Sequence, residues 1–86
     1  MTAPMTLEQA VEEARKRGLG PGWIAQDGPC GWPWRWLWHP RKPISRDWGA
    51  WGSPDPFVIL GTGAPNPDGW RETLTEITNI RRDANA

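Results

Sequence analysis

The sequence predicts an α+β fold in which one N-terminal helix, about residues 7–17, packs on a small antiparallel sheet of three to four strands. Three observations indicate this fold: a capped amphipathic segment near the N-terminus, Trp at every second position over 32–38, and an apolar run at 57–60. The chain has 86 residues, too few to bury two separate cores. Residues 1–86 are therefore expected to form a single domain.

The predicted helix is marked at both ends. Thr6 and Gln9 have the spacing of a capping box, in which each side chain bonds the backbone N–H of the other residue. Gly18, after a basic last turn, suits a left-handed C-terminal cap because glycine has no Cβ to clash there. One apolar stripe runs between these ends and contains Leu7, Ala10, Val11 and Ala14.

Two strands of a hairpin are expected after the helix. Residues 23–26 form the first strand, and turn-forming residues at 27–31 end it. The second strand covers 32–39, where Trp alternates with other residues. The alternating residues are Trp32, Trp34, Trp36 and Trp38. Because successive side chains of a strand point to opposite faces, all four indoles are expected on one face.

The second half of the chain is less regular. Residues 40–56 hold four Pro and two Gly and are expected to form an irregular loop. The apolar run 57–60 predicts a buried strand. Two alternatives stay open for 70–82, since its apolar residues have helical spacing whereas its many β-branched residues favour a strand. Residues 83–86 are expected to be a frayed tail.

The charge distribution singles out the middle of the chain. The ten basic and ten acidic residues balance, so the net charge predicts no attraction to nucleic acid. Residues 28–46, however, carry four basic residues and no acidic one. A single cysteine, Cys30, cannot form an intramolecular disulfide and indicates a reducing compartment. With no long apolar run and no signal-peptide pattern, we expect a cytoplasmic protein without membrane contact.

No pattern for catalysis or cofactor binding is visible. Cys30 and His39 are the one Cys and the one His, which is too few for a zinc site, and no acid that could orient them as a nucleophile and base is identifiable. Gly61-Thr62-Gly63 follows an apolar strand but lacks the third Gly or the Lys-Ser/Thr pair of a phosphate-binding loop. We expect no catalytic residue, no metal, no cofactor and no enzymatic activity.

Aromatic and basic residues are the candidates for partner binding. The Trp stripe at 32–38 has two interpretations, a sheet face covered by the helix or an exposed platform for bases, sugars or Pro-rich peptide. Two further Trp residues lie in the loop 40–56, among basic residues, and Trp and Arg are the types most enriched at binding hot spots. Alternatively, the Arg side chains stack on the indoles and cover them. The predicted partner-binding residues are Arg35, Arg41, Lys42, Arg46, Trp48 and Trp51.

Several segments together resemble the general layout of small phage or mobile-element proteins. They are Gly22-Trp23-Ile24-Ala25-Gln26-Asp27 with its turn, the Trp-rich strand, Lys42-Pro43, and Trp70-Arg71-Glu72-Thr73-Leu74. That group includes the anti-CRISPR inhibitors of bacterial CRISPR-Cas immunity. The resemblance implies a monomeric, non-catalytic protein of the bacterial host cell that inhibits a nucleoprotein complex sterically, specifically a type I CRISPR-Cas surveillance complex. Direct nucleic-acid binding is the alternative.

A second resemblance implies a different partner. Leu19-Gly20-Pro21-Gly22-Trp23, then Gly31, His39 and Trp48, look like a WW domain, whose paired aromatic residues clamp proline-rich peptide. The spacing from Trp23 to Trp48 is longer than in that family, and Trp51 stands where its closing proline would be.

Overall fold

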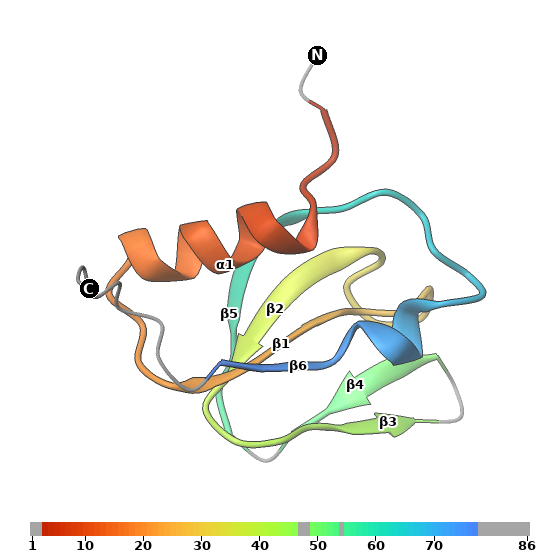
Figure 1. The fold of residues 1–86 in the computed structure, drawn as a ribbon. Coiled ribbons are helices and arrows are strands. Elements are labelled where there is room, and N and C mark those ends of the chain that lie inside the picture. Colours follow the sequence, from red (N-terminus) through yellow and green to blue (C-terminus); the bar gives the residue numbers. More distant parts are fainter. Residues whose placement is uncertain (1–2, 47–48, 54, 78–86) are drawn as a thin grey trace.

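The chain folds as a helix on a four-stranded antiparallel sheet, accompanied by a two-stranded hairpin, which confirms the predicted α+β class. The computed structural model describes residues 3–46, 49–53 and 55–77. The elements of these residues are α1 (Leu7–Lys16), β1 (Gly22–Gln26), β2 (Arg35–His39), β3 (Ile44–Arg46), β4 (Ala50–Gly52), β5 (Val58–Thr62), the 3-10 helix η1 (Trp70–Thr73) and β6 (Thr75–Ile77). The sheet has the order β5-β2-β1-β6, and β3 pairs with β4. Figure 1 shows α1 on one side of the sheet and the β3–β4 hairpin on the other.

Helix α1 begins and ends as its sequence indicates. The Thr6 hydroxyl accepts a hydrogen bond from the Gln9 N–H at 3.2 Å, and the Gln9 Oε1 accepts one from the Thr6 N–H at 2.9 Å. Gly18 has a φ of 73°, so the chain leaves the helix through a left-handed residue, and the Leu19 N–H reaches back to the Ala14 carbonyl at 3.1 Å. The helix is one residue shorter than the predicted 7–17. Over the described residues, no helix has the length and apolar content to cross a membrane.

The core lies between α1 and the sheet. Its buried members are Ala10, Ala14, Ile24, Trp36 and Leu60. Two small Ala residues of the helix leave room for the large indole of Trp36, whose Nε1 donates to the Met5 carbonyl at 2.8 Å. Trp38 packs against the same cluster, so the core interpretation of the Trp stripe holds for these two indoles.

The prediction of a strand over 32–39 is wrong at its start. Strand β2 begins at Arg35, and Trp34 adopts a φ of 63°, a left-handed conformation that ends the alternation of side chains between faces. Trp32 lies in the preceding turn and is 47% exposed. Only Trp36 and Trp38 therefore share a strand face, and the four-indole stripe does not exist.

Three other segments also differ from expectation. Residues 40–56 are not an irregular loop throughout, because they contain β3 and β4. Strand β5 starts after Phe57 and extends two residues beyond the predicted 57–60. In 70–82 each of the two alternatives holds for some of the residues. The first residues form the short helix η1, and the β-branched residues that follow form β6, which pairs with β1. The predictions for 78–82 and for the tail 83–86 lie outside the described residues.

Candidate partner-binding surface

A buried carboxylate fixes the β3–β4 hairpin to the main sheet. Asp27 follows β1 and is 2% exposed. Its Oδ1 accepts a hydrogen bond from the Trp51 N–H at 2.8 Å, and its Oδ2 accepts one from the Trp32 N–H at 2.6 Å. One side chain thus ties strand β4 and the turn before β2 to the end of β1. Cys30 adds a backbone bond from its N–H to the Gly49 carbonyl at 3.0 Å.

The indole of Trp51 is part of the same anchor. Its Nε1 donates to the Gln26 carbonyl at 2.8 Å, and its ring meets the ring of Trp70 edge to face, with centroids 5.7 Å apart. Trp51, predicted to meet a partner, therefore packs within the chain and is half-buried. Trp48, the other predicted loop indole, lies outside the described residues.

Three of the predicted basic residues lie along one segment, from the end of β2 through β3. Arg41 forms an ion pair with Asp55, with 3.2 Å between Arg41 Nε and Asp55 Oδ2. This carboxylate oxygen is buried, and the geometry of the ion pair does not give it a hydrogen bond. Lys42 places its Nζ 5.5 Å from the centre of the Trp23 ring. Arg46 is exposed at the end of β3. Lys42 thus covers an indole, the arrangement that was expected of the Arg side chains.

Arg35 does not join this group. It begins β2, whereas Arg41 follows the other end, and five strand residues span about 13 Å. The Arg35 guanidinium lies 5.6 Å from the centre of the Trp32 ring, at the turn between β1 and β2. The structure therefore separates the predicted patch into two places.

Two exposed residues, one in β3 and one that contacts it, were not predicted from the sequence. Ile44 is 63% exposed, the highest value among the exposed large apolar side chains of the described ranges. Arg71, from η1, stacks 4.4 Å from the centre of the Trp70 ring and donates from Nη2 to the Arg46 carbonyl at 3.2 Å. An apolar residue in the Pro-rich segment 40–56 was the available signal for Ile44, whereas the contact from Arg71 to Arg46 depends on the fold.

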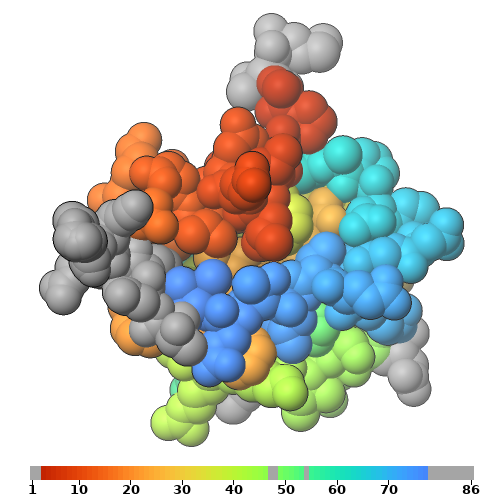
Figure 2. Space-filling model, viewed as in Figure 1, coloured from red at the N-terminus to blue at the C-terminus, as the bar shows by residue number. Residues whose placement is uncertain are grey.

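These residues define the hairpin surface, which consists of Lys42, Ile44, Ser45, Arg46 and Arg71. All five are exposed. Figure 2 shows the yellow-green segment around β3 at the surface of the molecule, below the blue segment of β6. Among the described residues, none of its three cations forms a salt bridge; the ion pairs found there are Arg15 with Glu12, Arg17 with Glu13 and Arg41 with Asp55. Within the described residues, the hairpin surface therefore carries positive charge without a carboxylate in contact.

His39, the last residue of β2, is buried. Its side chain is 1% exposed, and neither ring nitrogen has a hydrogen-bond partner among the described atoms. Burial lowers the pKa of His39 from its usual value of 6.5, and the negative charge of Asp27 opposes that shift. The Phe57 ring lies 5.8 Å from the imidazole. His39 is thus a neutral interior residue at pH 7.

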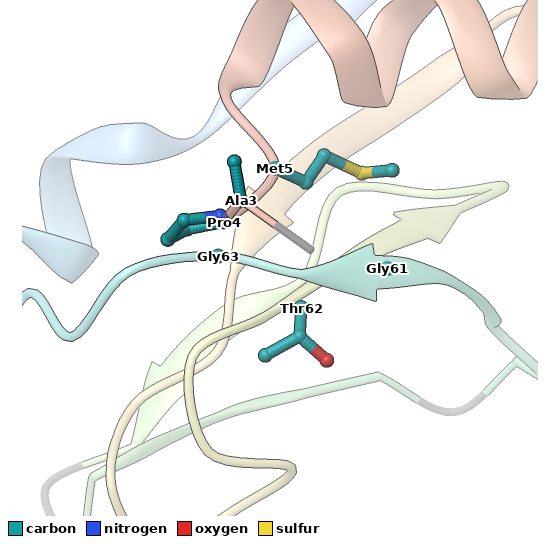
Figure 3. A pocket seen from close by; sticks show the side chains of 6 residues that line it. All are labelled: Ala3, Pro4, Met5, Gly61, Thr62 and Gly63. Atoms are coloured by element: carbon teal, nitrogen blue, oxygen red, sulfur yellow. The ribbon is translucent and has the colours of Figure 1, made fainter. Parts of the chain in front are cut away.

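A hollow lies elsewhere, along the edge of β5. Its volume is about 400 Å³, and Figure 3 shows the six residues that line it: Ala3, Pro4, Met5, Gly61, Thr62 and Gly63. Met5 pairs with Gly63 in a parallel bridge and donates its N–H to the Thr62 carbonyl at 2.8 Å. The side chains that line the hollow include one hydroxyl, that of Thr62, and no charged group. The lining therefore contains no side chain of the kind that usually acts as a catalytic acid, base or activated nucleophile.

The part of the chain that the structure describes contains no group of three or more His, Cys, Asp or Glu residues placed to hold a metal ion. Comparison of the chain with protein-family models, with curated proteins and with solved structures gives no match.

Proposed function

We propose that the chain is a non-catalytic binding protein that uses the hairpin surface to block a nucleoprotein complex sterically. One observation carries this proposal. A hairpin anchored by Asp27 and Trp51 presents three consecutive exposed residues, Ile44 to Arg46, beside cations that lack a carboxylate partner in the described structure.

The anchoring supports binding because it lowers the entropy lost on association. A strand already held in place by side-chain and backbone hydrogen bonds has little conformational freedom to lose when a partner arrives. Arg46 and Arg71 supply the residue type most favoured at charged contacts, and Ile44 supplies apolar area that a partner can bury.

The type of complex follows from the resemblance to anti-CRISPR proteins and is part of the proposal. A purified type I CRISPR-Cas surveillance complex is incubated with the chain, and binding of target DNA is measured. The wild type is expected to inhibit DNA binding. The double variant K42E/R46E is expected to lose at least about tenfold in inhibitory affinity, since each reversed charge meets the same partner group.

The control is K16E, because Lys16 is exposed on α1, on the other side of the sheet from the hairpin. It reverses one charge far from the hairpin surface and should inhibit like the wild type. If the wild type does not inhibit DNA binding, the choice of complex is wrong. Equal inhibition by the wild type and K42E/R46E contradicts the choice of surface.

Two alternatives have less support from the geometry. Base stacking needs free indoles, but Trp36, Trp51 and Trp70 make internal contacts, and Trp32, the most exposed described indole, has Arg35 beside its ring. Oligonucleotide affinity that falls steeply with salt would favour direct nucleic-acid binding. A WW-like groove needs paired aromatic residues that are free for peptide. Of the residues that carry that resemblance, Trp23 has Lys42 over its ring, His39 is buried, and Trp48 lies outside the described residues.

A further inference from the structure

We propose that the hairpin surface binds an extended, acidic segment of a partner protein, which adds as a third strand beside β3. This inference rests on the proposed function and specifies how the partner is held. In such β-strand addition, main-chain hydrogen bonds supply affinity, and alternate side chains supply specificity.

The hydrogen bonds of β4 show which backbone groups of β3 are free. Ser45 lies opposite Trp51 in the antiparallel pair. The Trp51 N–H donates to Asp27 Oδ1, so it points away from β3, and the two residues form a pair that exchanges no hydrogen bonds. The N–H and the carbonyl of Ser45 must then point away from β4, toward the open edge of the hairpin.

Of the other edges that the structure describes, those of β5 and β4 are occupied, and β6, at the second edge of the main sheet, has one exposed residue of three. Strand β5 lies at one edge of the main sheet, where the Met5 N–H bonds the Thr62 carbonyl and Arg17 Nη1 donates to the Ile59 carbonyl at 2.9 Å. The edge of β4 is bonded by Asp27 and Cys30. Strand β3, by contrast, has all three residues exposed.

The side chains around this edge indicate an acidic occupant. Ile44 and Arg46 share one face of the hairpin, because they are two residues apart in a strand, and Arg71 reaches the carbonyl of Arg46 from η1. An added strand would lie about 4.8 Å from β3. The Arg46 guanidinium lies over Gly52 of β4, and the Arg71 guanidinium bonds a carbonyl that faces β4, so both side chains must turn toward the open edge to reach that strand. Carboxylates would meet Arg46 and Arg71, and apolar residues would cover Ile44.

The test uses the ¹⁵N-labelled chain and a capped hexapeptide that alternates Glu and Val, with a Lys and Val hexapeptide of the same length as control. Titration followed by NMR is expected to shift the Ser45 amide signal with the acidic peptide and not with the basic one. No binding of the acidic peptide overturns the proposed partner chemistry.

Two variants test the pairing itself. S45P removes the outward N–H at a strand edge, where proline is tolerated, while S45A keeps that N–H. S45P is expected to weaken binding of the acidic peptide about tenfold, the equivalent of about one hydrogen bond, and S45A to bind like the wild type. Equal binding by S45P and S45A overturns strand addition.

A charge-swap variant covers the case in which S45P does not fold. R46E/R71E is expected to prefer the Lys and Val peptide over the Glu and Val peptide, and an unchanged preference overturns the role of the two guanidinium groups. The surveillance-complex assay separates the two proposals. If S45P inhibits that complex as well as S45A does, the proposed function stands and strand addition fails.

Discussion

Removing the carboxylate of Asp27 is expected to release the hairpin and strongly destabilise the chain. The carboxylate accepts two hydrogen bonds, at 2.8 Å from the Trp51 N–H and at 2.6 Å from the Trp32 N–H. Each bond to a charged group contributes about 1.5–3 kcal/mol, so D27A is expected to lose about 3–6 kcal/mol of unfolding free energy. A domain of this length has a total of about 4–13 kcal/mol. D27N, which keeps one acceptor oxygen, should lose about half as much as D27A.

Urea unfolding followed by Trp fluorescence measures these losses, because indoles of the core and of the anchor change environment when the chain unfolds. The matched control is D68N, at an exposed Asp between β5 and η1. It is expected to change the unfolding free energy by less than about 0.5 kcal/mol. A loss below about 1 kcal/mol for D27A would refute the anchoring role of Asp27.

Three further predictions concern the core, the helix and the hairpin contact. Burial lowers the pKa of His39, so the imidazole binds a proton less tightly in the folded chain than in the unfolded chain. The unfolding free energy should therefore fall below about pH 6.5, by at most about 1.4 kcal/mol per pH unit. Urea titrations at pH 7 and 5 measure this fall, and H39L should lose the part of it that comes from His39. T6A removes the capping box, so a loss of about 1 kcal/mol is expected, and no loss would contradict the role of the cap. G28A would place a Cβ 2.6 Å from the Trp70 ring and even closer to the Gly49 carbonyl, so the unfolding free energy is expected to fall by about 3 kcal/mol. A thermal melt measures this loss, and a Tm equal to that of the wild type would contradict the contact.

The sequence was sufficient for elements whose signals are local. The capping pair Thr6 and Gln9, together with Gly18, marks α1 to within one residue, and the short strand at 23–26 lies within β1. Such features depend on neighbours three or four residues away, so a single chain reveals them. The apolar run 57–60 located β5 for the same reason, with its ends displaced by one and two residues.

The hairpin surface depends on long-range contacts and was only partly predictable. The left-handed Trp34 costs backbone energy that the contacts of the folded turn offset, so the alternation of Trp gave no warning that β2 starts at Arg35. Strands β3 and β4 have three residues each, too few for a periodicity to be recognised. Basic residues indicated the segment, but the anchoring of Trp51 by Asp27, 24 positions away, could be found only from the fold.

Amide hydrogen exchange of the free chain, resolved by NMR, tests most directly whether the hairpin is anchored along β4 and open along β3. The structure predicts that the Trp51 N–H, bonded to Asp27, exchanges at least about a hundredfold more slowly than an unprotected amide, while the Ser45 N–H exchanges near the unprotected rate. A protected Ser45 amide together with a fast Trp51 amide would mean the opposite orientation of the hairpin and would contradict both the anchor and the open edge.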